Sequence, residues 1–335
     1  MMNLPPHSLK VSVGMCTYNS DSFLEEQLKS IAAQIRLPDE IIICDDGSTD
    51  RTLDILHSWK ESVSFTVQIY QNSKNLGYTK NFEKVMRLCT GDIIFLADHD
   101  DIWRPDRVSL CVEEFQKDEL LGLITTNAEL IDAEGTLQAI TLREYINLMH
   151  VHHFWCFFFP PGNTMELWTG CTMAIRRTFL NHLLPIPNHF ACHDIWIYLC
   201  MPLYAKIKYL DTCLIQYRLH GENYSTAPTV QNLLAHPSQW NYYNTILETL
   251  DFHGDLFHPL IAQAKKMPEG SLKHRFLQKL YRHQKHFARR KKICQHFWKN
   301  IGIFLGEILN GGYFFHPQGF RSMLYDFVKG SGIKS

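Results

Sequence analysis

The stretch IIFLADHDDIW, residues 93–103, joins an apolar run directly to a cluster of carboxylates. The apolar run at residues 93–97 has no polar alternation, which is typical of a strand that is buried on both faces. Asp98, Asp100 and Asp101 follow at once, and like charges this close together repel one another. The stretch therefore predicts a buried strand whose end carries a site for a compensating cation or dipole.

Similar apolar runs precede this stretch and alternate with helical patterns. VSVGMC (11–16), EIIIC (40–44) and VQIY (67–70) are expected to be strands. Residues 23–33, TLDILHSWK (52–60) and residues 81–89 have helical spacing, and Asp50 is a candidate cap for the second helix. Buried strands that alternate with helices predict an α/β fold with a mostly parallel sheet flanked by helices.

The chain changes character along its length. Between about 122 and 219, LITTNAELID, TGCTMAIRR and KIKYLDTCLIQYRLH are strand-like, and HDIWIYLCM is expected to form a short helix. From about residue 227 the pattern is mainly helical and rich in His, Lys, Arg and aromatic residues. We therefore expect a mixed sheet domain followed by a helical region.

Polar residues gather where the predicted strands end. Residues 17–19 follow the first strand, residues 45–49 the second and residues 98–101 the fourth. Ligands of such sheets bind beyond the carboxyl ends of the strands, so this edge is the expected site. On an extended backbone Asp98 and Asp100 would point the same way and could share Mg²⁺ or Mn²⁺. The alternative is a solvated acidic turn or an N-cap for the helix that follows Trp103.

Composition excludes several classes of protein. The 335 residues carry a net charge of -1, so nothing global indicates nucleic-acid binding. The 10 cysteines include no CxxC pair, which argues against a zinc site, and scattered thiols suit a reducing compartment. The N-terminus lacks a signal-peptide core, and no run approaches the ~18 to 20 apolar residues of a membrane span. We expect a cytoplasmic protein that does not span a membrane.

Several ordered motifs cover about residues 11–225, namely TYNSDSFLEEQLKSIAAQ, CDDGSTDRT, NLGYTKNFE, LADHDDIWRPDR, TGCTMAIRR, HDIWIYL and YRLHGEN. Together they resemble family 2 glycosyltransferases of the Rossmann-like GT-A fold. The LADHDDIW and YRLHGEN forms look most like the rhamnosyltransferase-like branch of bacterial surface polysaccharide synthesis, where Gln is more usual at His99. The resemblance implies a catalytic domain at 1–226, with a nucleotide-sugar half at about 10–120 and an acceptor half at about 121–226. A mainly helical region at 227–335 would follow.

The resemblance implies a role for each motif residue. Asp46 would accept from the ring N–H of the donor's base, Asp98 would contact the ribose or the metal, and Asp100 would be the principal metal ligand. His220 is a candidate further contact to the metal or the diphosphate. The other implied donor-binding positions are Thr17, Tyr18, Asp45, Asn75, Gly77 and Lys80. A capped DDGS turn is the alternative role for the Asp45–Asp46 pair, and a solvated side chain is the alternative for Lys80.

The acceptor half would supply the general base. The resemblance gives this role to Asp194, because an acceptor hydroxyl is a poor nucleophile until a carboxylate takes its proton. A helix cap is the alternative, and one residue can do both. The implied acceptor-side residues are Trp168, Gly170, Cys171, Thr172 and His193. The implied reaction is a single displacement that inverts the anomeric carbon of a dTDP-rhamnose-like or UDP-hexose donor. The implied acceptor is a hydroxyl of a growing bacterial surface glycan, and a lipid-linked glycan is one candidate.

The region after residue 271 is strongly basic. SLKHRFLQKLYRHQKHFARRKKICQHFWKN (271–300) contains no Asp or Glu and has a possible apolar stripe. Residues 271–305 are therefore a candidate contact with an anionic membrane surface, and a helix packed on the catalytic domain is the alternative. No nucleic-acid recognition motif accompanies the charge.

Three other functions compete with glycosyl transfer. A sugar nucleotidyltransferase typically has a glycine-rich loop with a basic residue after its first strand, where this chain has TYNS. The lack of GxGxxG at the same place argues against a dinucleotide-dependent oxidoreductase. The non-enzymatic alternative is a catalytically idle subunit that binds a nucleotide sugar within a glycan assembly complex. The joint presence of Asp46, Asp98, Asp100 and Asp194 argues against this alternative.

Overall fold

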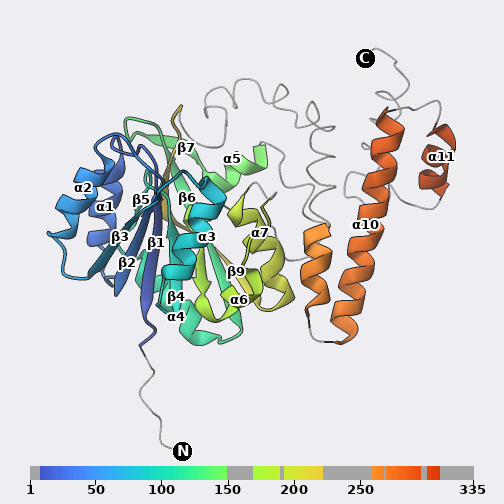
Figure 1. Ribbon diagram of the computed structural model, residues 1–335, viewed down its shortest axis with the longest axis horizontal. Coiled ribbons are helices and arrows are strands. Elements are labelled where there is room, and N and C mark those ends of the chain that lie inside the picture. Colours follow the sequence, from blue (N-terminus) through green and yellow to red (C-terminus); the bar gives the residue numbers. More distant parts are fainter. Residues whose placement is uncertain are drawn as a thin grey trace, which may run out of the picture. The chain divides into compact units, whose positions relative to one another are not determined.

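The computed structural model describes residues 8–148, 169–188, 192–221, 258–267, 269–295 and 300–309 (Figure 1). The chain divides into two compact units. The first comprises Met1–Tyr145 with Leu167–Val230, and the second comprises Ile146–Glu166 with Gln231–Ser335. The expected boundary between residues 226 and 227 stays a prediction.

The first unit begins with four parallel strands separated by helices. The order along the chain is β1 (Val11–Thr17), α1 (Leu24–Ala32), β2 (Glu40–Asp45), α2 (Thr52–Lys60), β3 (Thr66–Gln71), α3 (Tyr78–Leu88) and β4 (Ile93–Ala97). Every residue of β1, β2 and β4 is buried, as the apolar runs predicted. Helix α3 packs on β1 and β2, with Gly14 against Val85 and Cys89. The α/β fold expected from the sequence is confirmed.

The second half of the sheet is mixed. It contains β5 (Ile102–Trp103), α4 (Arg107–Lys117), β6 (Leu121–Ile131), β7 (Leu137–Thr141), α5 (Leu142–Leu148), the 3₁₀ turn η3 (Gly170–Thr172) and β8 (Ala174–Arg176). The 3₁₀ turn η4 (Arg177–Phe179), α6 (Leu180–Leu183), α7 (His193–Cys200), the 3₁₀ turn η5 (Met201–Leu203) and β9 (Lys206–Arg218) follow. The nine-stranded sheet has the order β3-β2-β1-β4-β8-β6-β9-β5, and β7 pairs with β6.

Strand β8 reverses direction beside β4. It pairs antiparallel with both β4 and β6, whereas β6 and β9 are parallel. An antiparallel strand begins where its neighbours end. The η3 turn, which enters β8, therefore lies at the carboxyl end of β4.

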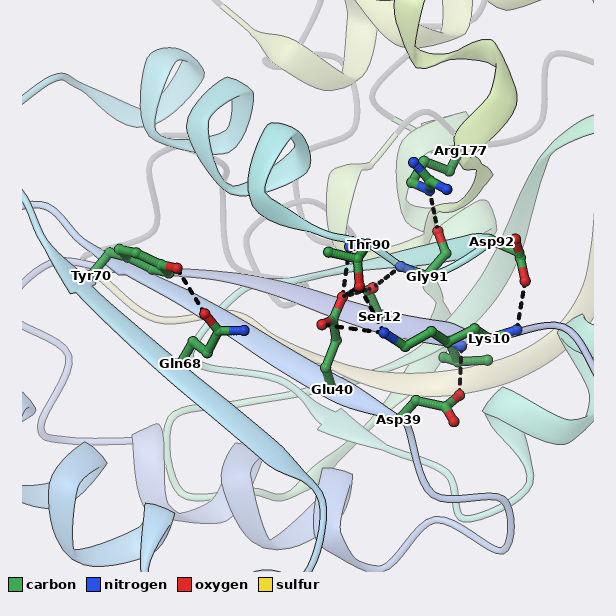
Figure 2. A network of polar contacts seen from close by, with 11 residues as sticks. Lys10, Ser12, Asp39, Glu40, Gln68, Tyr70, Thr90, Gly91, Asp92 and Arg177 are labelled. Carbon is green, nitrogen blue, oxygen red and sulfur yellow. Dashed lines mark hydrogen bonds and ion pairs between the residues drawn. The ribbon is translucent and has the colours of Figure 1, made fainter.

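A buried carboxylate joins the amino ends of the strands, at the opposite edge of the sheet (Figure 2). Glu40 at the start of β2 is only 4% exposed, and it accepts hydrogen bonds from Ser12 Oγ at 2.5 Å and from the Thr90 backbone N–H at 2.6 Å. Lys10 forms an ion pair with Glu40 at 3.7 Å and donates from its backbone N–H to Asp92. These contacts fix β1, β2 and the loop before β4 together at the edge away from the predicted site.

Some local expectations differ from the structure. Strand β3 is only partly buried because it lies at the edge of the sheet. Helix α3 begins at Tyr78, earlier than the predicted residue 81. Asp50 accepts from the Thr52 backbone N–H at 3.0 Å, but the N-cap of α2 is Arg51, so Asp50 lies one residue before the cap position it was expected to occupy. Only residues 174–176 of TGCTMAIRR form a strand, because Gly170–Thr172 form η3.

The second unit contains helical residues 258–265, α10 (Ser271–Gln295) and α11 (Ile301–Leu309). Helices α10 and α11 pack together through Ile293 and Phe304. Glu307 of α11 is 2% exposed, accepts from His286 Nδ1 at 2.5 Å and pairs with Arg289. Among the described residues, no helix has the length and apolar composition that crossing a membrane requires.

Candidate active site

Three parallel strands deliver polar side chains to one edge of the sheet. In the register of β1 and β2, Thr17 lies opposite Asp45, and Met15 of β1 lies opposite Ala97 of β4. The loops after these strands therefore start at nearly the same level. The expected convergence of 17–19, 45–49 and 98–101 at one edge follows directly from this register.

Asp45 shapes the turn that follows β2. One carboxylate oxygen accepts from the backbone N–H groups of Gly47 at 3.1 Å and Ser48 at 2.9 Å. The other oxygen accepts from Thr17 Oγ1 at 3.1 Å and from the Ser48 hydroxyl. Gly47 has φ 90°, a conformation that glycine adopts without steric penalty. Asp45 therefore acts as the anchor of this turn, and its contact with a donor stays a prediction.

Asp46 holds the loop that leads into α3. Its carboxylate accepts from the backbone N–H groups of Leu76 at 2.8 Å and Gly77 at 2.9 Å, and from Asn72 Nδ2 at 2.6 Å. Asn75 donates to the Asp46 carbonyl at 3.2 Å, and Gly77 has φ 79°. The predicted donor-binding residues Asp46, Asn75 and Gly77 are thus brought together. Their contact with a nucleotide base stays a prediction.

The acidic turn after β4 is bent. The backbone bends at His99 and Asp100, so the expected extended run through Asp98 and Asp100 does not occur. Asp98, Asp101 and Cys171 each place one possible ligand atom within 4.8 Å of the others, whereas Asp100 Oδ2 lies 2.9 Å from His220 Nε2. The bend thus divides the carboxylates into two neighbouring groups, Asp98 with Asp101 and Asp100 with His220. The alternating pattern of a strand does not reveal such a bend.

The carboxylates of this turn titrate very differently from one another. Burial, together with the charges of Asp100 and Asp101, raises the pKa of Asp98 well above its ordinary value. Burial and the charge of Asp100 raise the pKa of Asp101 to about 7. Burial also acts to raise the pKa of Asp100, but the hydrogen bond with His220 and the nearby imidazoles lower it overall. Asp100 is therefore the carboxylate best able to stay ionised.

Two buried arginines flank the acidic turn. Arg107 is fully buried, lies 3.9 Å over the Trp103 ring and donates to the Cys171 carbonyl at 2.5 Å. Arg218 is 1% exposed and donates from Nε to the Asp100 carbonyl at 2.9 Å. These guanidinium groups are fixed positive charges beside the carboxylates, which offset part of their repulsion. These two arginines were not predicted from the sequence, although Arg107 lies in WRPDR and Arg218 lies in YRLHGEN.

Asp194 lies in the first turn of α7. Its Oδ1 accepts from the Ile195 backbone N–H at 2.7 Å, and a hydrogen bond from the backbone of Gly170 also favours its charged form. Burial outweighs these bonds and raises its pKa from 3.8 to about 6. A carboxylate with a pKa near 6 is well suited to general-base catalysis near neutral pH, and its helix-cap contact does not prevent this.

His193 is part of the core. It is 0% exposed and stacks on Phe82 with a centroid separation of 4.0 Å, and burial lowers its pKa to about 3. Its ring nitrogens have no hydrogen-bond partner among the described residues. A Cβ atom at Gly170 would lie 2.7 Å from His193 Nε2, so η3 and α7 are in tight contact. His193 is therefore a neutral ring of the core, adjacent to Asp194 in the sequence.

The other predicted residues have varied environments. Lys80 is paired with Glu83 at 2.8 Å and donates to the Ile186 carbonyl at 2.5 Å. Tyr18 is 51% exposed at the end of β1. The predicted acceptor-side residues Gly170, Cys171 and Thr172 form the buried η3 turn. Trp168 lies outside the described residues.

The sequence profile described as "Glycosyl transferase family 2" matches residues 12–206, which is more than half of the chain. The chain belongs to glycosyl transferase family 2. An uncharacterized glycosyltransferase of Nostoc sp. is 31% identical to it over 228 residues, which are 64% of this chain and 66% of that protein. The chondroitin synthase of Escherichia coli is 32% identical over 64% of this chain and 30% of the synthase. The chain thus spans less than two thirds of the length of either relative.

Solved structures share the fold of this family 2 glycosyltransferase. Staphylococcus aureus TarS 1–349 in complex with UDP-GlcNAc has a TM-score of 0.59 at 15% identity, with 97% of this chain and 92% of TarS covered. A mannosyltransferase of Pyrobaculum calidifontis, in complex with GDP-Man and Mn²⁺, has a TM-score of 0.54 at 15% identity, with 99% and 91% covered. The GT-A assignment of the fold is confirmed by these neighbours.

The residues at the carboxyl edge fit a hard divalent cation. Carboxylate oxygens such as those of Asp98 and Asp100 are ligands that Mg²⁺ and Mn²⁺ take in proteins, and His220 offers an imidazole nitrogen 2.9 Å from Asp100 Oδ2. Asp101 Oδ2 is buried without a hydrogen-bond partner among the described residues, and burial and the charge of Asp100 raise the pKa of this carboxyl group to about 7. A bound cation would favour its ionised form.

Proposed function

We propose that this family 2 enzyme transfers a sugar from a nucleotide-diphosphate donor to a glycan hydroxyl with inversion, using Mg²⁺ or Mn²⁺. The single observation that carries the proposal is the placement of Asp46, Asp98, Asp100 and Asp194 on loops and a helix start around one sheet edge. The charge of Asp194 contributes to the raised pKa of Asp98, so the two carboxylates are close enough to interact.

The donor half positions the nucleotide sugar. The loop held by Asp46 would receive the base, and Asp98 would contact the ribose or the cation. Asp100 and His220 would hold the cation, which when bound neutralises diphosphate charge and stabilises the leaving group. The two buried arginines keep the ligand-bearing turn in place before any ligand arrives.

Asp194 would take the proton of the acceptor hydroxyl. Its pKa of about 6 keeps it mostly ionised at neutral pH while leaving it more basic than an exposed aspartate. The hydrogen bonds from Ile195 and Gly170 fix its orientation, and the neutral ring of the neighbouring residue His193 adds no competing charge. Deprotonation on the face opposite the leaving group gives a single displacement and an inverted anomeric centre.

The first experiment separates donor binding from transfer. Asp194→Asn should bind a nucleotide sugar with wild-type affinity yet lose transfer by about 10²- to 10⁴-fold, the usual contribution of a general base. Asp54→Asn, a change at an exposed carboxylate of α2, serves as the matched control and should transfer normally. Equal transfer by wild type and Asp194→Asn would refute the assignment. Undetectable transfer by the wild type, despite tight donor binding and a broad acceptor panel, would instead favour an idle nucleotide-sugar-binding subunit.

The donor proposal is a dTDP-rhamnose-like or UDP-hexose sugar, on a bacterial surface glycan. It is supported by the dTDP-rhamnosyl transferase RfbG of Shigella flexneri, which is 36% identical over 103 residues, 30% of this chain and 36% of RfbG. A panel of nucleotide sugars, each with Mn²⁺, Mg²⁺ or EDTA, can be scored by thermal stabilisation. The true donor should raise the melting temperature only when the cation is present. Stabilisation by GDP-sugars alone would reject the proposed donor class.

We also propose that α10 and α11 contact an anionic membrane at its cytoplasmic face. Lys285 and Lys292 are exposed on α10, and Ile301, Leu305 and Leu309 are exposed at four-residue spacing on α11. Each basic residue near such a surface contributes about 1 kcal/mol. Replacing both lysines with Gln should reduce flotation with anionic vesicles, whereas neutral vesicles should bind neither protein. Undiminished flotation of a 271–335 deletion would refute this role, and a lipid-linked acceptor would then lose its support.

A further inference from the structure

Arg218, at the end of β9, is a buried arginine with partners in several chain segments. Its side chain is 1% exposed, although an isolated arginine is among the side chains least often buried. Its guanidinium donates to Asp100, Ala133 and Glu26, none of which lies in its own strand. No ligand-binding role falls to it, because its donors are directed at protein oxygens.

Arg218 connects two distant segments, as well as its own strand, to the acidic turn. Nε donates to the Asp100 carbonyl at 2.9 Å, and Nη1 donates to the Ala133 carbonyl at 3.1 Å in the turn after β6. Nη2 donates to Glu26 of α1 at 2.5 Å. The backbone N–H of Arg218 donates to Asp101 Oδ1 at 3.2 Å. A single side chain thus fixes the backbone of Asp100 from one side while its own strand fixes Asp101.

Arg218 is also connected to His220 through an aromatic ring. Its guanidinium carbon lies 4.6 Å from the centroid of Phe23, and the His220 imidazole lies 4.8 Å from the same ring. Phe23 comes directly before α1, so it is held by a different element from either partner. His220 Nε2 in turn lies 2.9 Å from Asp100 Oδ2. The two proposed cation ligands therefore share one support, which comprises Arg218 and Phe23.

We propose that Arg218 is a positioning residue, which holds Asp100 and His220 at the spacing needed to bind the divalent cation. The proposal rests on the proposed metal-dependent transfer, and it adds a residue that touches neither donor nor acceptor. Arginine suits this task because its planar guanidinium presents five N–H donors in a fixed geometry. Lysine would keep the charge but could not reach the same set of oxygens. Outer residues that orient metal ligands typically change metal affinity by about 10- to 100-fold.

The test compares Arg218→Lys with a matched control at Arg176. Arg176 also donates to three backbone carbonyls, those of Leu121, Phe115 and Asp118, but it lies opposite Ile93, at the end of β4 away from the acidic turn. We expect Arg218→Lys to bind Mn²⁺ about 10-fold or more weakly by titration calorimetry. Arg176→Lys should lose stability yet bind Mn²⁺ as the wild type does. Equal Mn²⁺ affinities of wild type and Arg218→Lys, or equal losses in the two variants, would overturn the proposal.

A metal-free measurement gives a second readout. In the apoprotein, Arg218→Lys should accelerate hydrogen exchange in a peptide covering residues 98–103, and Arg176→Lys should not. If Arg218→Lys fails to fold, Phe23→Leu replaces it, because this change removes only the ring between Arg218 and His220. Phe23→Leu should weaken Mn²⁺ binding with little change in melting temperature, and unchanged binding would refute the shared support. A wild-type protein that bound no Mn²⁺ would instead refute the proposed metal dependence, so the two failures are distinguishable.

Discussion

Asp194→Asn should make the protein more stable while making it inactive. The pKa of Asp194 is about 6 in the folded chain, against 3.8 for an ordinary aspartate. Because folding raises this pKa, the charged form is disfavoured in the folded state. The carboxylate therefore lowers the free energy of unfolding at every pH above its folded pKa. This penalty is relieved as the pH falls through about 6 towards 4.

The size of the effect follows from linkage between protonation and folding. The two pKa values give a penalty of about 3 kcal/mol at pH 7 and about 0.6 kcal/mol at pH 4. Asparagine has no charge to desolvate, but it accepts less strongly from the backbone N–H groups of Ile195 and Gly170, which offsets about 1 kcal/mol. We expect Asp194→Asn to gain about 2 kcal/mol at pH 7 and to lose that advantage at pH 4.

The assay is urea unfolding of the metal-free protein at pH 4, 5, 6 and 7, for wild type, Asp194→Asn and the control Asp54→Asn. The difference in unfolding free energy between wild type and Asp194→Asn should grow with pH, and the control should show no such trend. In parallel, the wild-type transfer rate should fall about tenfold from pH 7 to pH 5, as the ionised fraction of a group with a pKa near 6 does. A variant that is less stable than wild type at pH 7, by an amount independent of pH, would refute the reasoning.

Three further predictions concern single contacts. Asp100→Asn should abolish the increase in melting temperature that Mn²⁺ gives the wild type, because it removes the carboxylate that His220 holds in its ionised form. If Mn²⁺ still raised the melting temperature of this variant, the assignment of Asp100 as a ligand would be contradicted. Gly170→Ala should lower the free energy of unfolding by about 1–3 kcal/mol and reduce transfer, since the new Cβ would meet the ring of His193 at 2.7 Å. An unchanged melting temperature would argue against this tight contact between η3 and α7. Glu307→Gln should destabilise α10 and α11 by about 2 kcal/mol, measured by helical circular dichroism on heating, while leaving Mn²⁺ affinity unaltered.

The buried strands were the most predictable part of the fold. The predominantly apolar runs at residues 11–16, 40–44 and 93–97 predicted strands that are buried on both faces. The structure agrees, because every residue of β1, β2 and β4 is buried. Strand β3 shares the apolar pattern but lies at the edge, and position within a sheet is not encoded in one strand's sequence. The two-residue strand β5 and the strand β7 are too short or too polar to be detected by periodicity.

The acidic residues of the candidate site were predicted from the sequence, but the bend and the arginines that support them were not. Strand order alone places residues 17–19, 45–49 and 98–101 at one edge, so the acidic residues could be inferred. The bend at His99 and Asp100 could not, because it depends on contacts from β9 and η3. Arg107 and Arg218 were missed for the same reason, since a buried arginine is recognised by partners that are distant in sequence.

The reversal of β8 beside β4 has a consequence for how this enzyme can diversify. The strand enters the sheet from the edge that carries the acidic turn, so η3 is anchored at the same edge as the proposed cation ligands. Glu40 and its partners hold the opposite end of the strands through separate contacts. Sequence change within η3 should therefore alter the acidic edge while leaving the contacts at the other end of the sheet intact.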